Sequence, residues 1–107
     1  MNLKKIERIF DMANLPPRRT GLKYQIWYGS KVPKHLPRIK VSLKDSELSI
    51  EILSHKVRGD ESKIDSSDLK LILEWIDLNR EVLLDYWENA ESGSIDPVEV
   101  AQRITKV

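Results

Sequence analysis

The sequence predicts an α+β fold in which a small antiparallel sheet packs against one long helix. Two observations lead to this fold class. Hydrophobic and polar residues alternate in three short segments before residue 53, as they do in half-buried strands, whereas hydrophobic residues recur at helical spacing between residues 66 and 91. The length of 107 residues suits one modest hydrophobic core and is too short for two. We therefore expect residues 1–107 to form a single domain.

Residues 66–91 are predicted to form the long central helix. At about 100° per residue, its large apolar side chains fall on two arcs that lie nearly opposite each other. The first arc, which is expected to face the sheet, contains Leu69, Ile72, Leu73, Ile76, Leu83, Leu84 and Trp87, and the second contains Leu71, Trp75, Leu78, Val82 and Tyr86. The second arc must pack against other elements, either the terminal helices or a second copy of the chain.

Shorter helices are predicted near both ends of the chain. Residues 3–14 carry apolar side chains at helical spacing, and Pro16 ends this helix because the residue before a proline is pushed out of helical geometry. Asp96 followed by Pro97 begins the last helix, in the favoured order of a capping residue and then proline. The predicted order is a short helix, three strands in an antiparallel meander, the long helix and a short C-terminal helix.

Three strands are predicted at residues 22–28, 38–44 and 48–52, and the last two are expected to form a hairpin. If Asp45 and Ser46 form a two-residue loop, the numbers of paired residues sum to 91. This register pairs Leu43 with Leu48, Val41 with Ile50 and Ile39 with Ile52 on one face, and Lys44 with Glu47 and Lys40 with Glu51 on the other. A longer loop is the alternative, because Asp-Ser is not a preferred two-residue turn.

Charge is distributed unevenly along the chain, although the net charge is only +1. Residues 12–44 contain eight Lys or Arg and no acid, whereas residues 45–99 contain fifteen acids and five bases, a net charge of −10. Such asymmetry predicts a surface for nucleic acid or an acidic partner. Alternatively, the two halves neutralise each other within the fold.

Composition excludes several classes of site. The absence of cysteine excludes disulfides, thiolate metal sites and a cysteine nucleophile. His35 and His55 lie on different predicted loops without other metal ligands, and the sequence contains neither a nucleophile elbow nor a glycine-rich phosphate loop. We therefore predict no metal, no cofactor and no catalytic residue, and leave the role of the two histidines open. Apolar runs of at most three residues predict a soluble, cytoplasmic protein without membrane contact.

The outer face of the predicted sheet is the candidate nucleic-acid interface. Cations there would contact phosphates while a base stacks on the indole ring. The predicted contact residues are Lys23, Trp27, Arg38, Lys40 and Lys44. A toxin-like ribonuclease is a variant of this hypothesis, but without a histidine on the sheet its general-base catalysis would be weak. Two other interpretations stay open: Trp27 packs under the terminal helices, or Lys40 only pairs with Glu51.

The second arc of the long helix is the candidate protein interface. Its residues Trp75, Leu78, Val82 and Tyr86 would bind a cognate protein partner or a second copy of the chain in a homodimer. Beside it runs an acidic stripe of Glu74, Asp77, Glu81, Asp85 and Glu88, which either meets a basic partner or a divalent cation or faces water. The first functional hypothesis is thus a non-catalytic interaction module, and the second is a nucleic-acid binder.

Two segments carry a family resemblance. Asn79, Arg80, Glu81, Leu83, Leu84 and Trp87 match a helix of the form Asn-Arg-Glu-x-Leu-Leu-x-x-Trp, while residues 36–41, LPRIKV, stand where a Pro-Pro-His-x-His-Val strand is common. Residues 22–87 thereby resemble a family of small bacterial domains of unknown function. Arg38 and Lys40 replace both histidines, so no role of that pair is carried over. The resemblance implies a bacterial cytoplasmic protein with a cognate protein partner, because members often occur in gene pairs that look like toxin–antitoxin modules.

Overall fold

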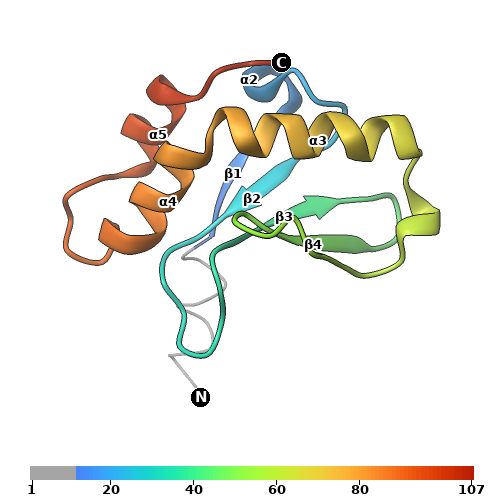
Figure 1. Cartoon of the computed structure of the whole chain (residues 1–107). Helices are drawn as coiled ribbons and strands as arrows, with labels where there is room; N and C mark the ends of the chain where they lie inside the picture. Colours follow the sequence, from blue (N-terminus) through green and yellow to red (C-terminus); the bar gives the residue numbers. More distant parts are fainter. Residues whose placement is uncertain (1–11) are drawn as a thin grey trace.

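The computed structural model describes residues 12–107, and most of the helix predicted at residues 3–14 lies outside this range. The described chain has an α+β fold, a five-stranded antiparallel sheet with helices on one face (Figure 1). The strands are β1 (Ala13–Leu15), β2 (Ile26–Tyr28), β3 (Arg38–Ser42), β4 (Glu47–Glu51) and β5 (Val57–Arg58), side by side in that order. The helices are α2 (Pro17–Thr20), the 3-10 turn η1 (Glu61–Lys63), α3 (Ser66–Leu78), α4 (Arg80–Asn89) and α5 (Pro97–Arg103).

The sheet is larger than the predicted three-stranded meander. Ala13 and Asn14, which were expected to end a helix, belong to β1 and pair with Tyr28 and Trp27. Pro16 favours this extended geometry just before it. At the opposite edge, β5 pairs with β4 within a segment predicted to be a loop, because a two-residue strand is too short to show alternation. The predicted strand at 22–28 is regular only from Ile26 onward.

The hairpin between β3 and β4 has the predicted faces but not the predicted register. Val41 lies opposite Leu48 and Ile39 opposite Ile50, so the numbers of paired residues sum to 89 rather than 91. The loop therefore contains four residues, closed by a hydrogen bond from the Leu43 amide to the Ser46 carbonyl at 2.8 Å. A shift of two residues keeps every side chain on its own face, which is why hydrophobic alternation alone could not distinguish the two registers.

The hydrophobic core lies between the sheet and the helices. From the sheet, Ile26, Ile39, Val41, Leu48 and Ile50 have no exposed surface, and from α3 the same holds for Ile72, Trp75 and Ile76. Helices cover this face, so the other face of the sheet presents the alternate residues of β2, β3 and β4 (Figure 1). No described helix has the length and apolarity to cross a membrane.

The prediction of one continuous central helix is wrong, because Asn79 separates α3 from α4. Its backbone leaves helical geometry, with φ −112° and ψ 14°, and α4 turns away from the axis of α3 (Figure 1). The buried Asn79 side chain donates from Nδ2 to the carbonyls of Trp75 and Thr105, both at 3.0 Å, and accepts the Thr105 amide at Oδ1 at 2.7 Å. The Asn79 side chain thus links the C-terminal segment to the junction between α3 and α4.

The helix caps agree with the sequence. Asp65 Oδ1 accepts the Ser67 amide at 3.3 Å at the start of α3, and Asp96 Oδ1 accepts the Glu99 amide at 2.9 Å at the start of α5. After α5 the chain runs back to α2, where the Val107 amide donates to the Thr20 carbonyl at 3.0 Å.

Candidate nucleic-acid interface

Alternation along β3 and β4 determines which side chains reach the outer face. Ile39 and Val41 are buried under the helices, so Arg38 and Lys40 point to the opposite side of the sheet. The outward residues of β4 are Glu47, Ser49 and Glu51. Register places Glu51 opposite Arg38 and Ser49 opposite Lys40.

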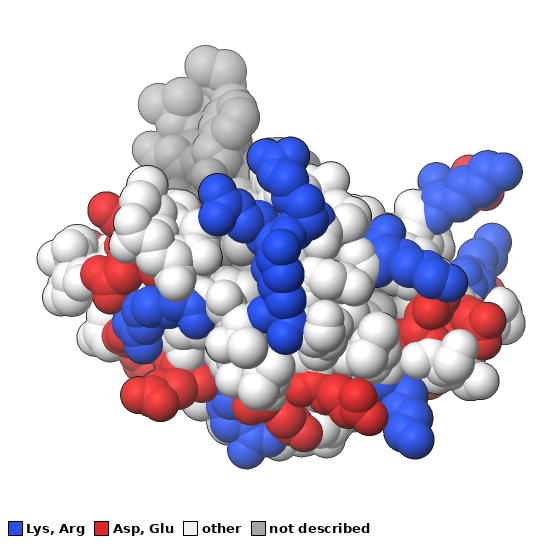
Figure 2. Space-filling view, turned by 90° about the horizontal axis from the view of Figure 1, so that it is seen from above, with Lys and Arg blue, Asp and Glu red and all other residues white. Residues whose placement is uncertain are grey.

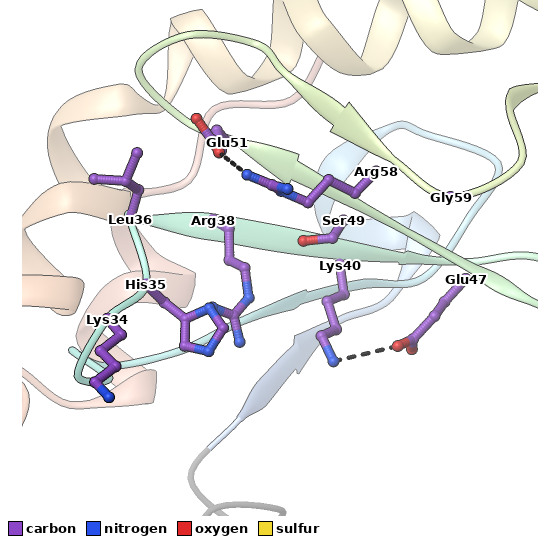
Figure 3. A pocket seen from close by; sticks show the side chains of 10 residues that line it. All are labelled: Lys34, His35, Leu36, Arg38, Lys40, Glu47, Ser49, Glu51, Arg58 and Gly59. Carbon is purple, nitrogen blue, oxygen red and sulfur yellow. Dashed lines mark hydrogen bonds and ion pairs between the residues drawn. The ribbon is translucent and has the colours of Figure 1, made fainter.

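This face contains a hollow of about 650 Å³, which we call the outer hollow (Figure 3). Its lining combines side chains of β3, β4 and β5 with the loop before β3. The lining residues are Lys34, His35, Leu36, Arg38, Lys40, Glu47, Ser49, Glu51, Arg58 and Gly59. Four of them are Lys or Arg and two are Glu, so the outer hollow has a formal charge of +2 with His35 neutral.

Both carboxylates of the outer hollow are bound to cations. Lys40 Nζ lies 3.2 Å from Glu47 Oε1, and Arg58 Nη2 donates to Glu51 Oε2 at 3.0 Å. Figure 3 shows these two ion pairs and, beside Lys40, the Arg38 side chain without one. Arg38 Nη1 is buried and has no hydrogen-bond partner in the part of the chain that the structure describes. Burial, and secondarily the nearby charge of Arg58, lower the pKa of Arg38.

Glu51 is held in its charged form by hydrogen bonds. The Ser54 hydroxyl donates to Glu51 Oε1 at 2.6 Å, and together with the bond from Arg58 this lowers the pKa of Glu51 from its usual value of 4.5. Since the lowered pKa belongs to the folded state, these bonds stabilise the fold above pH 4.5, and their contribution is lost as the pH falls through the lowered pKa.

We expect Ser54→Ala to raise the pKa of Glu51 toward its usual value, because the hydrogen bond that lowers this pKa most is removed. Titration of the Glu51 carboxyl carbon by NMR measures this change. Ser49→Ala, at the serine that lines the outer hollow, is the matched control and should leave that pKa in place. An unchanged Glu51 pKa in Ser54→Ala would show that the charge is held by Arg58 alone.

The structure brings together only part of the predicted nucleic-acid residues. Arg38 and Lys40 line the outer hollow, and Trp27 lies opposite Lys40 in β2, half-buried, with its indole N–H donating to Ser42 Oγ at 2.9 Å. Lys23 instead lies 3.5 Å from Asp68 of α3, on the helix side. Lys44 is exposed in the hairpin loop and does not line the outer hollow.

Sequence reasoning missed Arg58 and Lys34 as members of this surface. Arg58 lies on β5, in a segment that was predicted to be a loop. Lys34 lies in the loop before β3 and has a positive φ of 67°. Neither position carries a sequence pattern that would reveal its place. Their contribution depends on which segments the tertiary fold brings next to β3.

The predicted protein interface is mostly interior. Trp75 has no exposed surface, and Val82 and Tyr86 are 5% and 7% exposed, so these three residues belong to the core of the chain itself. Tyr86 packs edge-on against Tyr28 of β2, with ring centroids 4.9 Å apart. Leu78 alone among the four is exposed, at 53%. Val82 and Tyr86 follow the break at Asn79 and lie in α4, which turns away from the axis of α3, whereas Trp75 lies before the break.

The acidic stripe is partly neutralised within the chain. Asp77 accepts hydrogen bonds from Arg80 at 2.7 Å and contacts His55 Nε2 at 2.7 Å, and Asp85 accepts Arg103 at 2.7 Å. Among the described residues no group of three or more His, Cys, Asp or Glu is arranged to hold a metal ion. Seen from the helix side, Lys and Arg gather near the middle of the surface and acids lie around them (Figure 2). Cations and acids are therefore mixed on that side.

Searches among curated proteins and among solved structures found no match. A family model does match residues 21–88, which run from the glycine at the end of α2 to the penultimate residue of α4 and include the whole outer hollow. This range agrees closely with the segment 22–87 on which the resemblance was based, and it covers more than half of the chain. The chain therefore belongs to the family described as Domain of unknown function (DUF4160).

Proposed function

We propose that this protein is a cytoplasmic, non-catalytic binding module whose outer sheet face contacts the phosphates of single-stranded nucleic acid. The observation that carries the proposal is the outer hollow, where cations from two strands and a loop give a formal charge of +2. Phosphate contacts supply most of the affinity of proteins that bind nucleic acid without sequence preference. Arg38, which is not paired with a carboxylate of the described chain, is the cation best placed to make such a contact.

Trp27 supports the choice of a single strand. It lies on β2 directly beside Lys40 of β3, and its ring is half-buried rather than enclosed. A base that stacks on an aromatic ring next to a bound phosphate contributes affinity with little sequence preference. The described helices lie on the other face of the sheet, so none of them covers this surface (Figure 1).

We expect mixed-sequence single-stranded RNA and DNA to bind at low salt and to dissociate as salt rises. If about three phosphates are contacted, the slope of log K against log salt should be roughly −2. Fluorescence anisotropy of labelled oligonucleotides measures both quantities. Trp27→Ala should weaken binding without changing this slope, because it removes stacking and no charge. Leu78→Ala, on the helix side, should leave affinity unchanged.

The absence of any binding at low salt would contradict the proposal. Binding that is indifferent to salt would contradict it too, because phosphate contacts release counterions. Cleavage of the RNA during the assay, with loss of cleavage in Arg38→Ala, would instead indicate a toxin-like ribonuclease on the same face.

A cognate protein partner, of the toxin–antitoxin kind, or self-association as a homodimer is the second candidate. The observation that favours it is the exposure of Leu71 and Leu78 on the outer side of α3, at 37% and 53%. Glu74 and Glu81 lie in the same stretch and have no ion pair among the described contacts, which suits a partner with basic residues around an apolar centre. An apolar contact of this kind would persist at high salt, unlike phosphate binding.

A further inference from the structure

We propose that the outer hollow is a site for a terminal phosphate monoester, whose oxygens bind the Arg38 guanidinium. The inference rests on the proposed function in one respect, namely that the phosphate is the end of a nucleic-acid strand. It goes further by assigning one residue and one chemical group to the centre of the site.

The first argument is the hydrogen bonding of Arg38. A guanidinium carries five N–H donors, and buried donors in folded proteins almost always have an acceptor. Arg38 Nη1 is buried without one among the described residues. An oxygen of a ligand in the outer hollow would supply the acceptor once the Arg38 side chain turns toward it.

The second argument is that neighbouring carboxylates are already bound. Glu51 lies opposite Arg38 in the sheet, but its two oxygens accept Ser54 and Arg58, at 2.6 and 3.0 Å. Glu47 contacts Lys40 at 3.2 Å. These two ion pairs leave Arg38 without a carboxylate partner among the described residues.

The third argument is charge. The outer hollow has a formal charge of +2. A phosphate monoester carries about −1.5 to −2 at pH 7, whereas an internal phosphodiester or a carboxylate carries about −1. The monoester therefore matches the charge of the site best. Its oxygens also suit the planar fork of a guanidinium, which binds phosphate through two parallel hydrogen bonds.

The fourth argument is space. A volume of about 650 Å³ exceeds what one phosphate fills and lies within the range of small-molecule sites, roughly 300–1,000 Å³. Leu36, 62% exposed, adds an apolar wall at the margin of the outer hollow. The terminal nucleotide attached to the phosphate can therefore occupy the remaining space.

The test compares a twelve-nucleotide oligo-dT with a 5′-phosphate, with a 3′-phosphate and without either, by competition anisotropy. We expect one phosphorylated form to bind at least about tenfold more tightly than the unphosphorylated strand, the size of one charge-assisted hydrogen bond. Arg38→Ala should abolish this preference. Arg18→Ala removes the same charge from α2, away from the outer hollow, and should keep it.

A second variant guards against misfolding of Arg38→Ala. Arg38→Lys keeps the charge and the aliphatic stem but loses the fork of donors, so it should fold and show a smaller preference. Circular dichroism melting of each variant checks the fold.

The outcomes separate the two proposals. Equal binding of all three strands would overturn the phosphate monoester site and leave the proposed function in place. If no strand binds but inorganic phosphate raises the melting temperature of the wild type and not of Arg38→Ala, the site stands and the proposed function falls. If neither strands nor phosphate have any effect, both are wrong.

Discussion

Replacing Trp75 with alanine is expected to lower the free energy of unfolding by about 3 to 5 kcal/mol, the usual cost of removing a large aromatic side chain from a core. Trp75 has no exposed surface and belongs to the main core cluster. Its indole N–H has no hydrogen-bond partner among the described residues, so the loss comes from packing and cavity formation alone. Urea denaturation followed by circular dichroism measures the change.

Leu78 provides a matched control on the same helix. It lies three residues further along α3 and is 53% exposed, so Leu78→Ala should change the free energy of unfolding by no more than about 0.5 kcal/mol. Comparing Trp75→Ala with Leu78→Ala also tests whether Trp75, a residue of the second arc, is interior or at the surface. If Trp75 were instead at a surface that binds a partner, Trp75→Ala would leave the isolated chain as stable as the wild type.

Asn79→Ala is expected to lower the free energy of unfolding by about 2 to 3 kcal/mol. Its side chain makes three hydrogen bonds to backbone groups of Trp75 and Thr105, and a net contribution of about 1 kcal/mol each is typical. Alanine also favours a continuous helix at the position where the chain must turn. The loss should appear first in the C-terminal segment, because Thr105 is held by this residue.

Hydrogen exchange resolves that local effect. The amides of Thr105 and Val107 should exchange faster in Asn79→Ala, since the first loses its acceptor and the second lies in the released segment. Asn89→Ala is the control, because Asn89 is exposed and makes one side-chain bond, to Asp85 at 2.7 Å. A stable Asn79→Ala variant with unchanged exchange at Thr105 would mean that the C-terminal segment is held elsewhere.

Features that depend on local sequence patterns could be predicted for particular helices and strands. The alternation of Ile39 and Val41 with Arg38 and Lys40 was sufficient to assign β3 and its two faces, since neighbouring residues of a strand point in opposite directions. The order of Asp96 and Pro97 predicted the start of α5. The register of the hairpin was off by two, because a four-residue loop preserves the same alternation as a two-residue loop.

The break at Asn79 and the composition of the outer hollow could not be predicted in this way. A helical period continues across Asn79, and the acceptors and donors that turn the chain there belong to Thr105, 26 residues away. Likewise Lys34 and Arg58 join Arg38 only because β5 adds to the edge of β4 and the loop before β3 bends back.

The sequence by itself determined the fold class, the outward position of Arg38 and Lys40 and the caps of the helices, since each depends on neighbours within a few residues. The tertiary structure alone decided that Trp75, Val82 and Tyr86 are interior and that Arg38 has no carboxylate partner among residues 12–107. Both depend on contacts between segments far apart in the chain, where local periodicity carries no information about which surfaces meet.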